Sequence, residues 1–114
     1  MFDPGMIELF RLQADICKTL ADPNRLMMLH LLRDGERSVS QIVAILGLPQ
    51  SNVSRHLAVL RERSLVETRR EGTTIYYRLG NQMIGEACDM VRSVLQNKLE
   101  RDQALVTSLG NAGH

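Results

Sequence analysis

Residues 38–60 read SVSQIVAILGLPQSNVSRHLAVL, and this stretch decides the fold. The spacing Ser38-x-x-Gln41 is a capping box, which begins a helix, and Gly47 is a favourable left-handed residue to end it. Pro49 stands near the first turn of a second helix, where its missing amide donor costs little. Two short helices joined by a tight turn are typical of a helix-turn-helix.

The second of these helices has one apolar and one polar face. Val53, Leu57 and Leu60 recur at the spacing of one helix face and predict its buried side. The opposite face carries Ser51, Ser54, Arg55 and Ala58. Small polar groups and one arginine suit a helix in the DNA major groove, because bulky side chains would hold the backbone away from the base edges. In the preceding helix, the side chains expected to be buried are Ile42, Ile45 and Leu46.

A hairpin and three more helices complete the expected order. Residues 65–70 and 74–79 are rich in strand-forming residues and flank a turn at Gly72, which predicts a β-hairpin. Helices are predicted over residues 6–20, from Asp22-Pro23 to Asp34-Gly35, and from Gln82 to Glu100 or a little beyond. The fold class is therefore mainly α with a small β-hairpin. It is a winged helix-turn-helix of four helices, two strands and a fifth helix.

The chain has 114 residues, which support one domain. We expect a winged-helix domain over residues 1–107 and a frayed tail over 108–114. The two terminal helices are apolar along more than one face, which is more apolar surface than a small core can cover. A homodimer through these terminal helices is the expected solution, and it would place two recognition helices about one DNA turn apart.

The bulk composition excludes several classes of protein. No apolar run approaches the roughly 18 residues of a membrane span, and the N-terminus lacks the pattern of a signal peptide. Two cysteines without a secretion signal do not indicate a disulfide framework, so the cytoplasm is the expected compartment. Neither a Ser-His-Asp spacing nor a phosphate-binding glycine loop is present, and we therefore expect no enzyme.

Charge is distributed unevenly along the chain. The net charge is only +1, but residues 51–78 hold six arginines against three glutamates. A basic segment between two faintly acidic ones is typical of a nucleic-acid contact, although a solvated charged face gives the same pattern. A winged-helix module that binds proteins, or a constitutive DNA-binding regulator without a small ligand, remains an alternative.

Three segments, 20–26 (LADPNRL), 49–57 (PQSNVSRHL) and 65–72 (LVETRREG) followed by Tyr76-Tyr-Arg-Leu79, resemble the ArsR/SmtB family of bacterial winged-helix repressors. The resemblance covers roughly residues 15–100. It implies a homodimer that binds a pseudo-palindromic operator in double-stranded DNA and leaves it when an inducer binds. The candidate DNA contacts are Gln50, Ser51, Asn52, Ser54, Arg55, His56, Arg69 and Arg70. For His56, a local packing role is an equal alternative.

Two positions depart from the pattern of the family. Ser64 stands where a glycine commonly ends the recognition helix, and serine is less favourable if the residue is left-handed. Thr73 stands where many members have arginine after the glycine of the wing. The grip of the wing on DNA is therefore expected from Arg69 and Arg70.

The effector is the least defined part of the sequence. The family senses metals through carboxylate and histidine sites on the last helix, or through cysteine clusters. The last helix here has acidic residues but no histidine, and residues 39–46 have no cysteine. Cys17 and Cys88 remain as candidates for a soft metal, a metalloid or an oxidant. The alternatives are buried cysteines with no sensing role, an organic effector or a protein effector. No metal or cofactor is predicted with certainty, and His30 is expected to be a partly buried structural residue.

Overall fold

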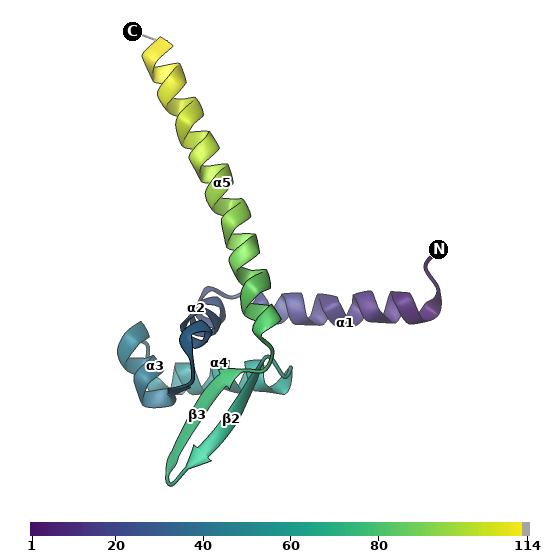
Figure 1. The fold of residues 1–114 in the computed structure, drawn as a ribbon, viewed down its shortest axis with the longest axis vertical. Coiled ribbons are helices and arrows are strands. Elements are labelled where there is room, and N and C mark those ends of the chain that lie inside the picture. The colour runs from purple at the N-terminus through teal and green to yellow at the C-terminus, as the bar shows by residue number, and fades with distance from the viewer. Residues whose placement is uncertain (113–114) are drawn as a thin grey trace.

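The computed structural model describes residues 1–112, and Figure 1 shows their arrangement. The elements are α1 (Pro4–Leu20), α2 (Pro23–Leu31), the 3-10 turn η1 (Leu32–Asp34), β1 (Arg37–Ser38), α3 (Val39–Leu46), α4 (Gln50–Glu62), β2 (Val66–Glu71), β3 (Thr74–Leu79) and α5 (Gln82–Ala112). The four helices, the hairpin and the last helix follow in the predicted order. The winged helix-turn-helix is thus confirmed.

Local hydrogen bonds begin and end the helices as the sequence predicts. The carboxylate of Asp22 accepts the amide hydrogen of Asn24 at 2.8 Å and so caps α2. Both bonds of the capping box of α3 are present, from the Gln41 amide to Ser38 Oγ at 3.2 Å and from the Ser38 amide to Gln41 Oε1 at 2.8 Å. Gly47 ends α3 with a φ of 68°. Each cap lies within a few residues of its partner, which is why the sequence reveals it.

The core lies between α2, α3, α4 and the hairpin. Its buried apolar residues are Met28, Leu29, Leu32, Ile42, Val53, Leu57, Leu60, Leu65, Val66 and Leu79. Leu46 packs against this core, but Ile45 is 51% exposed, so its predicted burial was wrong. A helix of two turns buries only the narrow stripe that faces α2 and α4, and Ile45 lies beyond the edge of that stripe.

The sheet has a third strand that the sequence did not reveal. The strand order is β1-β3-β2, with β3 antiparallel to both neighbours. Arg37 pairs with Tyr77 and Ser38 with Tyr76. Two residues are too few to show the period of a strand, and their partners lie far along the chain. This short strand anchors the hairpin to the beginning of α3, since Ser38 also caps that helix.

Two long helices leave the body in different directions (Figure 1). The radius of gyration is 18.6 Å, although a compact domain of this length has a value of about 13 Å. These two helices, the arms, expose the large apolar side chains of Met6, Ile7, Leu9, Phe10 and Leu12 on α1, and of Met83, Met90, Val91, Val94, Leu95, Leu99, Leu105, Val106 and Leu109 on α5. Within residues 1–112, no helix is long and apolar enough to cross a membrane.

The last helix is longer than predicted. It continues through Ala112, so residues 108–112 are helical rather than frayed, and residues 113–114 lie outside the described part of the chain. Leu105, Val106 and Leu109 continue the apolar spacing of the helix beyond Glu100. This continued spacing indicates a longer helix, and the prediction of an end near Glu100 did not take it into account.

A tight junction joins the end of α4 to the start of α5. Ser64 has a φ of 60°, the left-handed conformation anticipated at this position. The Leu65 amide donates to the Leu60 carbonyl at 3.0 Å, and the Gly80 amide donates to the Leu65 carbonyl at 3.0 Å. A Cβ atom on Gly80 would lie 2.4 Å from the Ser64 carbonyl oxygen. Only glycine therefore fits at this crossing of two backbones.

Gly80→Ala is expected to lower the free energy of unfolding by about 1–3 kcal/mol, because the clash is with backbone and cannot be relieved by turning a side chain. Urea unfolding followed by circular dichroism at one fixed protein concentration measures this change. Gly110→Ala is the matched control, since a Cβ there meets nothing within 4 Å. A Gly80→Ala midpoint equal to that of the control would contradict the crossing.

Candidate nucleic-acid interface

The exposed face of α4 begins at its first turn. Gln50, Ser51, Ser54 and Arg55 are all exposed there, while Val53, Leu57 and Leu60 are fully buried. This division matches the prediction from the sequence. The result is a rigid helix, held by the core along one side, that presents short polar side chains and one guanidinium on the other. Such a face can enter a major groove and donate to base edges.

Two other predicted contacts in α4 lie elsewhere. Asn52 is half-buried, and its Oδ1 has no hydrogen-bond partner within residues 1–112. His56 is only 6% exposed, with its Nδ1 atom 3.2 Å from Nη1 of Arg25. Because arginine has donors only, His56 Nδ1 accepts this bond. Of the two roles left open for His56, the structure favours local packing. Its place three residues after Val53 puts it on the buried face.

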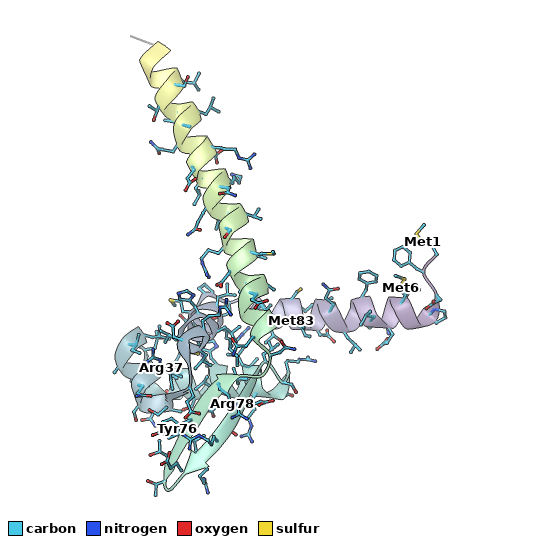
Figure 2. All side chains as sticks on the ribbon, in the orientation of Figure 1. Met1, Met6, Arg37, Tyr76, Arg78 and Met83 are labelled. Atoms are coloured by element: carbon cyan, nitrogen blue, oxygen red, sulfur yellow. The ribbon has the colours of Figure 1, made fainter. Side chains whose placement is uncertain are left out.

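The wing presents its two candidate arginines differently. Arg70 is exposed and has no carboxylate partner among the described residues. Arg69 donates to Glu71 at 2.9 Å, is paired with Glu36, and stacks 4.7 Å over the ring of Tyr76. The hydrogen bond from Arg69 lowers the pKa of Glu36, so that carboxylate is charged near neutral pH. Figure 2 shows the side chains of this hairpin, with Tyr76 and Arg78 labelled.

Ion pairs neutralise part of the basic segment. Arg78 bonds to Glu67 across the hairpin at 3.1 Å, and Arg63 lies 4.0 Å from Asp15. Together with Arg69, half of the six arginines therefore have acidic partners. Within the part of the chain that the structure describes, the arginines of this segment that lack an acidic partner are Arg55, Arg61 and Arg70. Positive charge is thus concentrated along α4 and on one strand of the wing.

The two cysteines differ in environment. Cys17 is exposed on α1, whereas Cys88 is partly buried on α5 and packs against the core. Burial raises the pKa of the Cys88 thiol, which favours the protonated and less reactive form. Within residues 1–112, no three His, Cys, Asp or Glu side chains are grouped so that they could hold a metal ion.

An ion cluster at the base of α5 was not predicted from the sequence. Asp89 accepts two bonds from Arg33, at 3.0 and 2.8 Å, and it also pairs with Arg92. Burial tends to raise the pKa of Asp89, but the bonds from the two arginines outweigh it and the pKa is lowered. His30 is exposed beside Arg92, so its expected partial burial was wrong. The stem of Arg33 covers Gly85, where a Cβ would lie 2.3 Å from Arg33 Cδ.

Comparison with known proteins decides which kind of winged helix this is. Residues 22–68 match the profile of a family described as "Bacterial regulatory protein, arsR family". The transcriptional regulator Rv0081 of Mycobacterium tuberculosis is 36% identical over 106 residues, which cover 92% of this chain and 93% of that protein. The chain belongs to the ArsR family. As an ArsR-family protein it is a DNA-binding transcriptional regulator rather than an enzyme.

Other ArsR-like proteins agree in fold. The crystal structure of Rv0081 superposes with a TM-score of 0.75 at 36% identity, covering 88% of this chain and 97% of that one. The solution structure of Mb0332 from Mycobacterium bovis, described as a homodimeric winged helix-turn-helix DNA-binding domain, gives 0.79 at 34% identity and covers 87% and 92%. The regulator KmtR of Mycobacterium tuberculosis is 45% identical over 73 residues, which is 64% of this chain but only 56% of KmtR.

Proposed function

We propose that this chain is a homodimeric repressor that binds a pseudo-palindromic operator through α4 and is released from it by an inducer. One observation carries the proposal: a rigid body presents the polar face of α4, and two apolar arms extend from that body uncovered. One winged-helix domain would thus provide both DNA binding and dimerisation. Its place of action is the cytoplasm, where bacterial DNA lies.

The proposed DNA contacts follow the exposure of the side chains. Gln50, Ser51, Ser54 and Arg55 would read base edges, because they share the free face of α4. Arg70 would contact phosphate from the wing. Those left out of direct contact are His56, which is buried, and Arg69, whose guanidinium is shared by two carboxylates. Asn52, which is half-buried at the edge of this face, remains a candidate for DNA contact.

The proposed dimer follows from the two arms. The exposed apolar faces of α1 and α5 exceed what a small monomeric protein usually leaves in water. Packing them against the same helices of a second copy buries both at once, as a two-fold interface requires. Mb0332, which has the same fold, is described as homodimeric. The dimer would also align two α4 helices on successive turns of the major groove.

The proposed inducer could act through thiols, but the two cysteines give unequal support. Cys17 is exposed on α1, so a soft metal ion or an oxidant can reach it in the free chain. Cys88 is packed against the core and its pKa is raised by burial, which favours a packing role. The test adds peroxide or soft metal ions to DNA complexes of the wild type, Cys17→Ser and Cys88→Ser. Release from DNA that is lost in a serine variant indicates a thiol-dependent inducer. Complexes that none of these reagents release indicate an organic or protein inducer.

The test of DNA binding is a salt titration. The probe is a duplex that the wild-type chain selects from a pool of randomised sequences, and fluorescence anisotropy gives its affinity. We expect affinity to fall steeply with added salt and Arg70→Ala to reduce the log-log slope by about 1, since one phosphate contact is lost. Arg69→Ala is the matched control, and its slope is expected to change less because Glu36 and Glu71 already neutralise the side chain.

A flat salt dependence in the wild type would favour the alternative of a protein-interaction module. An equal loss of slope in both variants would contradict the assignment of the wing contact to Arg70 alone.

A further inference from the structure

Arg25 lies where α1, α2 and α4 meet, and it bonds to two of these helices with its side chain. Its Nε atom donates to the Thr19 carbonyl oxygen at 2.6 Å, in the last turn of α1. Its Nη1 atom donates to Nδ1 of His56, the buried histidine of α4, at 3.2 Å. Its own amide donates to the capping carboxylate of Asp22 at 3.2 Å, which holds its backbone at the start of α2.

Each of these bonds meets a need of the fold. The carbonyl groups in the last turn of a helix have no partner within that helix, so the Thr19 oxygen is free to accept from Arg25. His56 is 6% exposed, and a buried ring nitrogen without a donor would destabilise the core. A guanidinium is planar and rigid, so two bonds from one such group fix the directions of both acceptors relative to each other.

We propose that Arg25 is a positioning residue that fixes the orientation of α4 relative to α1. If the proposed function holds, this orientation affects DNA recognition, because α1 is part of the proposed dimer interface and α4 is the proposed reading helix. A fixed angle between them sets the separation of the two α4 helices in the dimer. Arg25 therefore determines which spacing of operator half-sites the protein accepts, although it does not touch DNA.

The first measurement requires neither DNA nor a dimer. Cysteine spin labels at Gln13 on α1 and Ser54 on α4, both exposed, are introduced with Cys17→Ser and Cys88→Ser. Pulsed electron resonance then gives the distribution of the distance between the labels within one chain, with unlabelled protein in excess. We expect a narrow distribution in this background and a broader one when Arg25→Lys is added, because the donors of lysine rotate on a single nitrogen at the end of a flexible stem and cannot hold both acceptors in fixed directions.

Two further variants keep the test sharp. Arg11→Lys is the matched control, since Arg11 is an exposed arginine of α1 whose acidic partner within residues 1–112 is Glu8 of the same helix. His56→Leu removes the acceptor on α4 and fills its place in the core with an apolar side chain. This variant provides the same test if Arg25→Lys does not fold. Broadening by Arg25→Lys or His56→Leu, but not by Arg11→Lys, supports the proposal. Distributions as narrow as in the background overturn it.

The second measurement concerns spacing. The selected duplex is remade with one base pair inserted between or removed from its half-sites, which turns them by about a tenth of a turn relative to each other. Wild type is expected to lose affinity on both changed duplexes, and unlabelled Arg25→Lys to lose distinctly less. An unchanged spacing preference overturns the consequence for recognition. If no duplex binds while the distance distribution broadens, the proposed function fails and the positioning role stands.

Discussion

Val94→Glu is expected to convert the dimer into a monomer and to weaken binding to the selected duplex roughly 100-fold, the scale by which two linked contacts exceed one. Val94 is 67% exposed on the free face of α5. If this face is the interface, a carboxylate there loses water without gaining a partner, which is strongly unfavourable. The two-fold axis brings the change twice into each interface. Sedimentation equilibrium gives the mass, and anisotropy on the same samples gives the affinity.

Gln96→Glu is the matched control for this experiment. It places the same charge on the same helix, at an exposed position outside the apolar face. We expect it to leave both mass and affinity as in the wild type. A wild-type chain that sediments as a monomer, or a Val94→Glu chain that remains a dimer, would place the interface elsewhere or remove it.

Arg55→Ala is expected to weaken binding to the selected duplex by about 1–3 kcal/mol, the range for losing a bidentate contact to a base. Arg55 is exposed on the same face as Ser51 and Ser54, and no acidic partner holds it within residues 1–112. The loss should fall mainly on duplexes with the preferred base, so that discrimination between sequences relaxes. Anisotropy on a series of duplexes with single base-pair changes in one half-site measures both effects.

Arg61→Ala is the control that distinguishes a base contact of Arg55 from sequence-independent electrostatic attraction to the phosphates. Arg61 is another exposed arginine of α4, but it lies near the end of that helix, away from the polar first turn. We expect its removal to weaken all duplexes alike. If Arg55→Ala also weakens all duplexes alike, Arg55 contacts phosphate rather than a base.

The sequence predicted the parts of this fold that depend on near neighbours. The capping box of Ser38 and Gln41, the left-handed Gly47 and the polar face of α4 all appear as expected. In the candidate site, the exposure of Gln50, Ser51 and Arg55 was predicted as well. These features need only helix periodicity and bonds between residues three or four positions apart, and both can be read along the chain.

The sequence did not show which of the charged and polar side chains were already bonded. Arg69 and Arg70 are adjacent and identical in type, yet only Arg69 meets Glu36, 33 positions away in the chain. His56 is held by Arg25, 31 positions away. The short strand β1 became visible only through its pairing with β3.

For this protein, then, the sequence alone determined the order of the five helices and the hairpin and the face that meets solvent on α4, because backbone hydrogen bonding and amphipathic spacing are local. Only the tertiary structure decided which arginines lack an acidic partner, which histidine is buried and how α1 is tied to α4. Those outcomes depend on distances between side chains that are remote in sequence. Such distances are set when the helices pack around Leu57 and its neighbours in the core.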